Sequence, residues 1–145
     1  MIKEFGQQFS ISKSVREQHT DTTTIHTSKL PDGVVFAENE IDVKKTVEIC
    51  QKYKCPIIPF GVGSSLEGHV NALYGGISID LNNMNKILHV SPEDGYAVVQ
   101  PGVTREQLNV YLRDTGLFFP IDPGANASLG GMASTNASGT NAVRY

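Results

Sequence analysis

The sequence predicts an α+β fold, with a small parallel α/β part over residues 1–70 followed by part of an antiparallel sheet with helices over residues 71–145. An apolar run, a helical segment and a second apolar run succeed one another between residues 33 and 60, which is the order of a βαβ unit. From residue 76 apolar and polar residues alternate, as in a half-buried strand of an antiparallel sheet. A chain of 145 residues with 39% apolar content is long enough for about one domain with its own core.

The elements of the first part follow from local signals. Residues 1–30 are polar with little periodicity, so we expect a short helix and an extended lead-in. Residues 34–36 read as a short buried strand, and Asn39 is placed to cap a helix that runs to about Tyr53. One face of that helix is predicted to carry Val43, Val47 and Cys50.

The loop after the second strand, residues 59–69, combines two glycines with two serines. Small residues let backbone N–H groups close around an anion, and no lysine or arginine lies between Cys55 and Asn85. A phosphate bound here would therefore rely on main-chain donors and on the hydroxyls of Ser64 and Ser65. Leu66 stands where a dinucleotide fingerprint needs glycine, and the Gly-Lys-Ser or Gly-Lys-Thr ending of a P-loop is absent from the sequence. The alternative is an ordinary tight turn between two strands.

The second part contains a hairpin and a well-signalled helix. Residues 87–90 and 97–99 are joined by a Ser-Pro and Asp-Gly turn, which predicts antiparallel strands. A helix is expected over residues 105–114, with Thr104 as its cap and Gly116 just past its end. Three further residues complete the start signal: Val103 and Leu108 as a hydrophobic staple, and Gln107 as the capping-box partner.

A tract of small residues extends from Gly124 to Ala142, in which only Leu129 and Met132 are neither Gly, Ala, Ser, Thr nor Asn. A flexible linker has such a composition. The amide and hydroxyl groups of residues 134–136 instead suit contact with the hydrogen-bonding edge of a flat ring, which indicates a ligand site.

Composition limits the other functions. With 12 basic and 15 acidic residues, a net charge of −3 and no basic block, the chain is not expected to bind nucleic acid. No apolar signal core and no transmembrane segment is seen, so we expect a cytoplasmic protein. Cys50 and Cys55 fit neither a redox nor a zinc spacing and are expected to be buried or half-exposed thiols, and the dispersed His19, His26 and His89 predict no metal site.

Six segments, in order along the chain, resemble motifs of the PCMH-type FAD-binding domain of the vanillyl-alcohol oxidase class. They are residues 59–69, 80–87, 100–103, 119–124, 130–139 and 144–145. The resemblance covers about residues 16–145 and is nearest to the D-lactate dehydrogenase and glycolate oxidase flavoproteins. Residues 16–19 and 67–69 favour the D-lactate dehydrogenase side.

The resemblance implies FAD as cofactor and a PCMH-type fold that is incomplete at its C-terminal end. Gly61 to Ser65 would surround the diphosphate, and the stretch from Pro123 to Gly139 would line the adenosine and isoalloxazine regions. The cofactor-binding residues so implied are Phe60, Gly61, Val62, Gly63, Ser64, Ser65, Gly68, His69, Pro123, Ser128, Gly130, Gly131, Ser134, Thr135, Asn136 and Gly139. For His69 three roles stay open: a polar contact to FAD, a covalent flavin link, or a hydrogen-bonded structural histidine, of which the structural role is favoured.

For the whole protein the resemblance implies oxidation of a small-molecule 2-hydroxy acid, D-lactate foremost, by hydride transfer to flavin N5 and then to an unidentified electron acceptor. No catalytic residue is assigned. The alternatives are a truncated or split, non-catalytic FAD-binding module that needs a C-terminal partner fragment, or a glycolate oxidase subunit.

Overall fold

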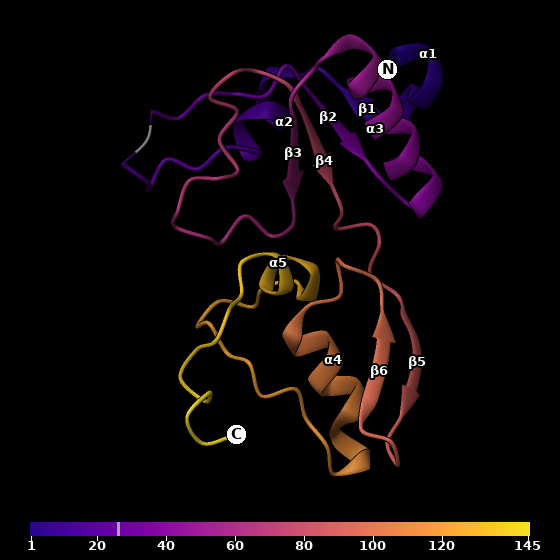
Figure 1. Cartoon of the computed structure of the whole chain (residues 1–145), viewed down its shortest axis with the longest axis vertical. Coiled ribbons are helices and arrows are strands. Elements are labelled where there is room, and N and C mark those ends of the chain that lie inside the picture. The colour runs from indigo at the N-terminus through magenta and orange to yellow at the C-terminus, as the bar shows by residue number, and fades with distance from the viewer. Residues whose placement is uncertain (26) are drawn as a thin grey trace. The chain divides into compact units, whose positions relative to one another are not determined.

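A computed structural model of the chain describes residues 1–25 and 27–145, and it divides into two compact units, Met1–Asn83 and Met84–Tyr145 (Figure 1). The predicted mixture of a parallel sheet and an antiparallel sheet is confirmed. Each unit has its own cluster of buried apolar side chains. His26 lies outside the described residues.

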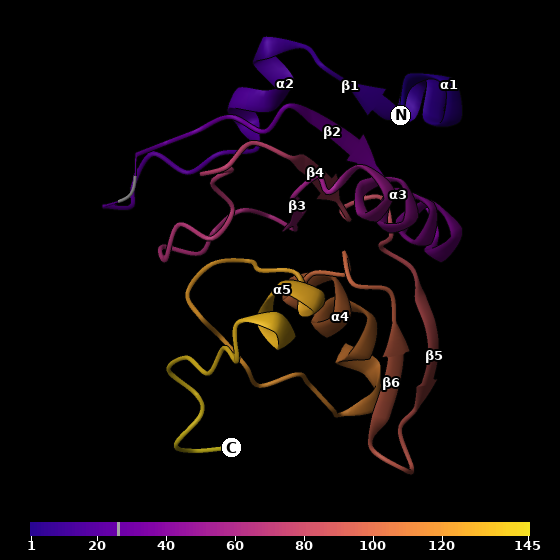
Figure 2. The same cartoon turned by 45° about the horizontal axis from the view of Figure 1, so that its top comes forward.

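The first unit is built on a four-stranded sheet in the order β1-β2-β4-β3 (Figure 2). Its strands are β1 (Phe9–Ser10), β2 (Gly33–Phe36), β3 (Ile57–Phe60) and β4 (Ile77–Asp80). The strands β2, β4 and β3 run parallel, and β1 pairs with β2 antiparallel. The expected βαβ unit is thus present, with β4 inserted between its two strands.

The antiparallel pairing expected from residue 76 onward is wrong for β4. This strand is parallel to both neighbours, and all four of its residues are buried. Its alternation of apolar and polar residues arises because polar side chains are accommodated inside the unit: Asp80 is paired with His19. Because β4 holds β2 and β3 together, the first unit extends to Asn83 and not to the predicted boundary at residue 70.

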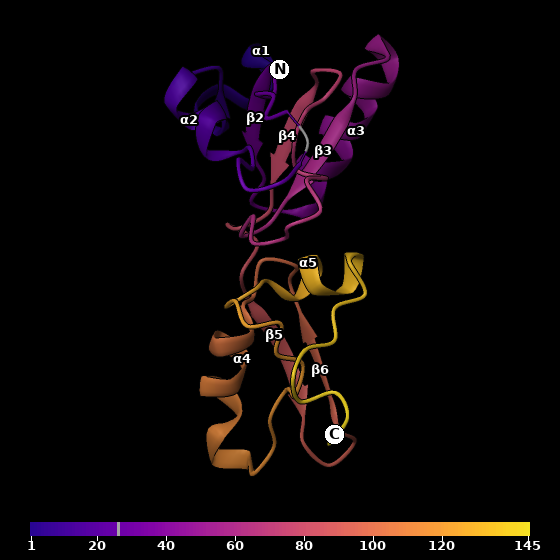
Figure 3. The same ribbon diagram turned by 90° about the vertical axis from the view of Figure 1, so that its left-hand side faces the viewer.

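The two faces of this sheet carry different elements (Figure 3). On one face, α3 (Glu40–Tyr53) and α1 (Ile2–Phe5) bury Cys50 and Phe5 against Val35 and Ile77. On the opposite face lie Phe36, Phe60 and Asp80, which alternate with the first set along their strands. His19, directly after α2 (Lys13–Gln18), contacts all three residues of this second face. The short 3-10 helix η1 (Gly6–Gln8) links α1 to β1.

Helix α3 begins as predicted, because the Asn39 side chain accepts a hydrogen bond from the Asp42 amide at 3.1 Å. It ends in a left-handed residue, Lys54, with φ +52°. Its buried residues are Thr46 and Cys50, whereas Val47, expected on that face, is 40% exposed. Thr46 tolerates burial because its hydroxyl donates to the Asp42 carbonyl at 2.8 Å.

The second unit pairs a hairpin with a helix. Strands β5 (Ile87–Ser91) and β6 (Tyr96–Val99) are antiparallel, as predicted. Helix α4 (Arg105–Leu112) is capped by Thr104, whose hydroxyl accepts from the Gln107 amide at 3.2 Å. The 3-10 helix η2 (Arg113–Thr115) follows where the sequence predicted more α-helix, and Gly116 ends it with φ +75°.

The staple and the capping box have different outcomes. Val103 and Leu108 are buried together in the core of this unit, as the staple predicts. The side chain of Gln107 does not return to the cap residue and donates instead to the Asn85 carbonyl at 2.9 Å. The Thr104 half of the predicted capping box is therefore formed. The Gln107 side chain, which would form the other half, instead connects α4 to the segment before β5.

The small-residue tract is ordered by specific contacts. Residues Leu129–Ser134 form α5, a helix that the composition of the tract does not predict. Isolated β-bridges pair the backbone of Ser128 with that of Thr104, and the backbone of Gly139 with that of Asp122. The tract is therefore a structural part of the second unit, in contrast to the linker alternative. No helix among the described residues is long and apolar enough to cross a membrane.

Candidate functional site

The loop after β3 presents a row of unused backbone donors. Within the described residues, the amides of residues 61–65 donate no hydrogen bond to any other group. A run of amides without a partner in the chain, at the carboxyl end of a parallel strand, is suited to an incoming anion. Val62 and Ser64 are exposed, so these donors can be reached from solvent.

The two serines of this loop differ. Among the described residues, Ser64 makes no hydrogen bond through its hydroxyl. Ser65 donates its hydroxyl to the carboxylate of Glu67, and this bond lowers the pKa of Glu67. The phosphate contact expected from Ser65 is thus already replaced by an internal one, while Ser64 is available.

The base of the loop is fixed to β4. The Leu81 amide donates to the Phe60 carbonyl at 3.0 Å, and the Asn82 side chain donates to the Gly61 carbonyl at 2.8 Å. The Asn82 amide in turn donates to the Asp80 carboxylate at 2.8 Å. The loop therefore starts from a rigid frame, which keeps its free amides in place.

Gly63 has a left-handed backbone, with φ +67°. A Cβ built on it would lie 2.7 Å from Cζ of Phe60. Both the conformation and the aromatic ring beneath it require glycine at this position. Phe60, expected to contact the cofactor, is 8% exposed and serves as the floor of the loop.

At the end of the loop, Gly68 is buried with φ +76°, and its carbonyl accepts from the Asn71 amide at 3.0 Å. His69 is exposed, and its ring makes no hydrogen bond with any residue that the structure describes. The favoured role as a hydrogen-bonded structural histidine is therefore not seen. His69 lies close enough to two carboxylates to contribute to lowering the pKa values of Glu67 and Asp21, after larger effects of Ser65 and Thr23 respectively.

Three glycines of the second tract, Gly130, Gly131 and Gly139, are closely packed. A Cβ on Gly130 would lie 2.5 Å from Cβ of Pro101, and one on Gly139 would lie 1.8 Å from the Asp122 carbonyl oxygen. A Cβ on Gly131 would lie 3.0 Å from the Ser128 hydroxyl. Their glycine character therefore has a structural cause within the second unit.

The polar residues of the tract are mostly used locally. Ser134 and Thr135 donate their hydroxyls to the carbonyls of Gly130 and Gly131, at 2.8 and 3.0 Å. Ser128 is 2% exposed. Pro123 and Asn136 are exposed, and Asn136 has φ +51°. The side-chain amide of Asn136 is exposed and makes no hydrogen bond with any residue that the structure describes.

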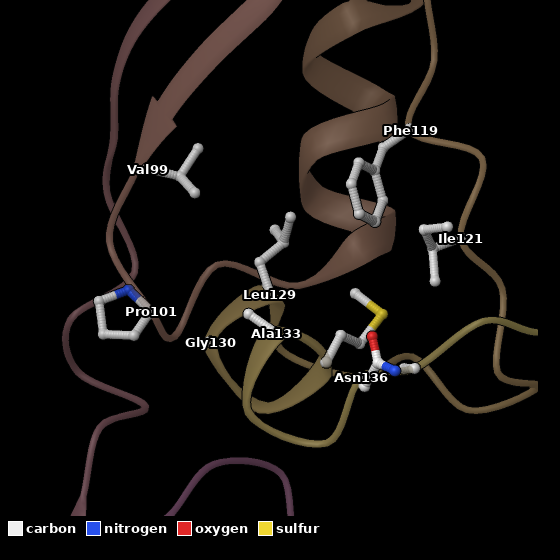
Figure 4. A pocket seen from close by; sticks show the side chains of 10 residues that line it. Val99, Pro101, Phe119, Ile121, Leu129, Gly130, Ala133 and Asn136 are labelled. Carbon is white, nitrogen blue, oxygen red and sulfur yellow. The ribbon is translucent and has the colours of Figure 1, made fainter.

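The second unit contains a cavity of about 530 Å³ (Figure 4). Asn136 is the single polar side chain on its wall. The remaining lining residues are Val99, Pro101, Phe119, Ile121, Leu129, Gly130, Met132, Ala133 and Ala137. An apolar wall with one amide suits a flat ring with a hydrogen-bonding edge.

The predicted residues thus form two groups. One group, Phe60 to His69, belongs to the loop of the first unit, and the other, Pro123 to Gly139, belongs to the second unit. Sequence reasoning missed His19, because its partner Asp80 is 61 positions away and no spacing signal connects them. Among the described residues, no group of three or more His, Cys, Asp or Glu side chains is placed to hold a metal ion.

The comparisons with known proteins agree with these features. The FAD binding domain family matches residues 31–145. A probable mitochondrial D-lactate dehydrogenase of Danio rerio is 53% identical over 136 residues, which cover 94% of this chain and 27% of that protein. The glycolate oxidase subunit GlcD of Bacillus subtilis is 29% identical, and the match covers 96% of this chain and 30% of that protein. The chain therefore spans less than a third of these relatives.

Solved structures share the fold. Alkyldihydroxyacetonephosphate synthase superimposes with a TM-score of 0.87 at 28% identity, covering 99% of this chain and 29% of that one. p-Cresol methylhydroxylase superimposes with a TM-score of 0.68 at 26% identity, covering 79% and 23%. The predicted PCMH-type resemblance is confirmed, and so is FAD as the cofactor. The chain belongs to the FAD binding domain family.

Proposed function

We propose that this chain binds the FAD diphosphate through the loop of residues 61–65 and is the FAD-binding part of an oxidoreductase that acts on D-2-hydroxy acids. The proposed diphosphate binding rests on the row of free amides in that loop, together with the free hydroxyl of Ser64. No acidic residue lies between Gly61 and Leu66 to oppose an anion. The donor set therefore fits a diphosphate.

The substrate class is supported by the relatives. The curated relatives include D-lactate dehydrogenases and a D-2-hydroxyglutarate dehydrogenase of Escherichia coli, the latter 34% identical and covered to 15% of its length. Among these acids we propose D-lactate, because the D-lactate dehydrogenases of Danio rerio and Arabidopsis thaliana are 53% and 47% identical. The chemistry that FAD supplies when bound is acceptance of a hydride from the hydroxyl-bearing carbon.

In this assignment the chain's own residues bind and orient the cofactor. The amides of residues 61–65 hold the diphosphate, and Asn82 holds the loop by its bond to Gly61. In the second unit, Asn136 and the apolar cavity would receive a ring of the cofactor. A partner fragment and the electron acceptor stay predictions. The cytoplasmic location also stays a prediction, because several relatives are named as mitochondrial.

FAD titration of the purified chain tests the loop assignment. Gly63→Val should weaken binding at least about tenfold, since the side chain would occupy the space above Phe60 and displace the amides. Gly95→Val is the matched control: Gly95 has nearly the same backbone, φ +69°, but lies in the β5–β6 turn with open space around it. Equal affinity of wild type and Gly63→Val by isothermal titration would refute the diphosphate assignment.

A further inference from the structure

Both ring nitrogens of His19 face hydrogen-bond acceptors. Nδ1 lies 2.7 Å from the Val15 carbonyl oxygen, and Nε2 lies 2.9 Å from Oδ2 of Asp80. A carbonyl can only accept, so Nδ1 carries a proton, and an ionised carboxylate requires a proton on Nε2 as well. His19 is 4% exposed and Asp80 is 6% exposed, so water does not compete for either group. An imidazolium that donates from both ring nitrogens, one to the Val15 carbonyl and one to the Asp80 carboxylate, fits this geometry.

Among the described residues, His19 is the single ion-pair partner of Asp80. The strands packed against His19, which are β2, β3 and β4, contain no ionisable side chain except Asp80. On α2, Lys13 pairs with Glu17 at 3.6 Å, and the Arg16 guanidinium donates to the Pro31 carbonyl at 3.2 Å. Between Cys55 and Asn85 the chain has no lysine or arginine. A neutral residue at position 19 would therefore leave an unpaired buried carboxylate.

The pair is connected to the diphosphate loop in two ways. Oδ1 of Asp80 accepts from the Asn82 amide at 2.8 Å, and the Asn82 side chain holds the Gly61 carbonyl at 2.8 Å. The His19 ring also packs against Phe60, with a centroid distance of 4.4 Å and an interplanar angle of 46°, and Phe60 is the floor beneath Gly63. Only the Asn82 residue therefore lies between the carboxylate of Asp80 and the loop whose amides receive the anion.

We propose that His19 is a positioning residue for FAD: its imidazolium neutralises Asp80 beside the loop of residues 61–65, so that a loop without lysine or arginine can accept a diphosphate. This inference rests on the proposed diphosphate role of the loop. Burial alone lowers the pKa of His19, but the bonds to Asp80 and Val15 outweigh it and raise the pKa above its ordinary value, which agrees with the geometry.

A double-mutant cycle on FAD affinity tests the proposal. His19→Gln leaves the carboxylate unpaired, and we expect FAD binding to weaken at least about tenfold. Asp80→Asn removes the charge but keeps an oxygen for the Asn82 amide, so its affinity should stay within about threefold of wild type. The double variant should likewise return to within about threefold of wild type. Failure of Asp80→Asn to rescue His19→Gln would show that the histidine acts by packing, and it would overturn the proposal.

Two readouts do not depend on folding of His19→Gln. As the pH rises and His19 loses its proton, FAD affinity of wild type should fall, whereas that of Asp80→Asn should not follow the same titration; parallel profiles would overturn the proposal. In the FAD-free chain, nitrogen-15 NMR should find both His19 ring nitrogens protonated at neutral pH. A ring with one unprotonated nitrogen would also overturn it.

The outcomes separate this inference from the proposed function. If Gly63→Val leaves FAD affinity unchanged, the loop is not the diphosphate site and the proposed function fails. If Gly63→Val weakens binding while His19→Gln does not, the loop assignment holds and only the role of His19 is refuted.

Discussion

Cζ of Phe60 lies 2.7 Å from the point that a Cβ on Gly63 would occupy, so the aromatic ring and the glycine form a single packed unit at the start of the candidate diphosphate loop. The Phe60 ring in turn packs against the His19 ring at a tilted angle. The free amides of the loop therefore lie above a buried aromatic ring. A substitution at Phe60 or at Gly63 should alter the packing of the other residue.

We expect Gly63→Ala to destabilise the FAD-free chain more than Gly95→Ala. Both positions have positive φ, +67° and +69°, so both substitutions cost about 1–2 kcal/mol for the left-handed backbone. Only Gly63 adds a collision with Phe60, because the space around Gly95 is open. Urea denaturation measures the difference, and equal losses in the two variants would contradict the packed-unit description.

Stability should depend on pH through His19. Its folded-state pKa is raised, so the stabilisation is complete below the unfolded-state pKa of about 6.5 and is lost as the pH rises through the folded value. The free energy of unfolding of wild type should therefore fall as the pH rises above about 6.5, until the folded state has lost the extra proton. Asp80→Asn is the control for other titrating groups and should lack this decline. A decline of the same size in both proteins would assign it to other residues.

Gly139→Ala should disrupt the second unit. The new Cβ would lie 1.8 Å from the Asp122 carbonyl oxygen, which also accepts a hydrogen bond from the Thr140 amide at 3.2 Å. We expect a loss of more than about 2 kcal/mol, together with faster hydrogen exchange at Thr140. Gly124→Ala is the matched control, since Gly124 has φ +90° but open space, and it should lose only about 1 kcal/mol. Unchanged exchange at Thr140 in Gly139→Ala would show that the bridge is not maintained in solution.

The two cysteines should react with thiol reagents at different rates. Burial and the neighbouring Cys55 raise the pKa of the Cys50 thiol to about 11, and Cys50 is 1% exposed. The thiolate is the reactive species, so Cys50 should stay unmodified at neutral pH while the partly exposed Cys55 is alkylated first. Mass spectrometry after brief iodoacetamide treatment, with Cys55→Ser as control, measures the order. Preferential labelling of Cys50 would contradict the packing of α3.

The chain alone, loaded with FAD, should not oxidise D-lactate. Hydride transfer needs a held substrate with a base in reach of its hydroxyl proton, and no residue lining the described cavity is ionisable. Anaerobic flavin bleaching on addition of D-lactate is the assay, with L-lactate as control. Rapid bleaching by D-lactate only would place a complete active site within these residues.

Local signals in the sequence were sufficient where a few neighbouring residues decide the structure. Asn39 and Thr104 cap their helices, Gly116 takes the left-handed conformation, and the hairpin of β5 and β6 forms at the predicted turn. The glycines and serines of the loop likewise predicted an anion site, because small side chains are visible in the sequence itself, and this site stays a prediction.

The tertiary structure alone decided what depends on distant partners. The alternation in β4 predicted an antiparallel, half-buried strand, yet β4 is central and fully buried, because His19 supplies from 61 positions away the charge that makes Asp80 tolerable inside. The glycines at positions 130 and 139 looked like openings for a ligand, but Pro101 and Asp122 fill the space beside them. Sequence shows which residues are small or charged, whereas only the packed chain shows what each of them faces.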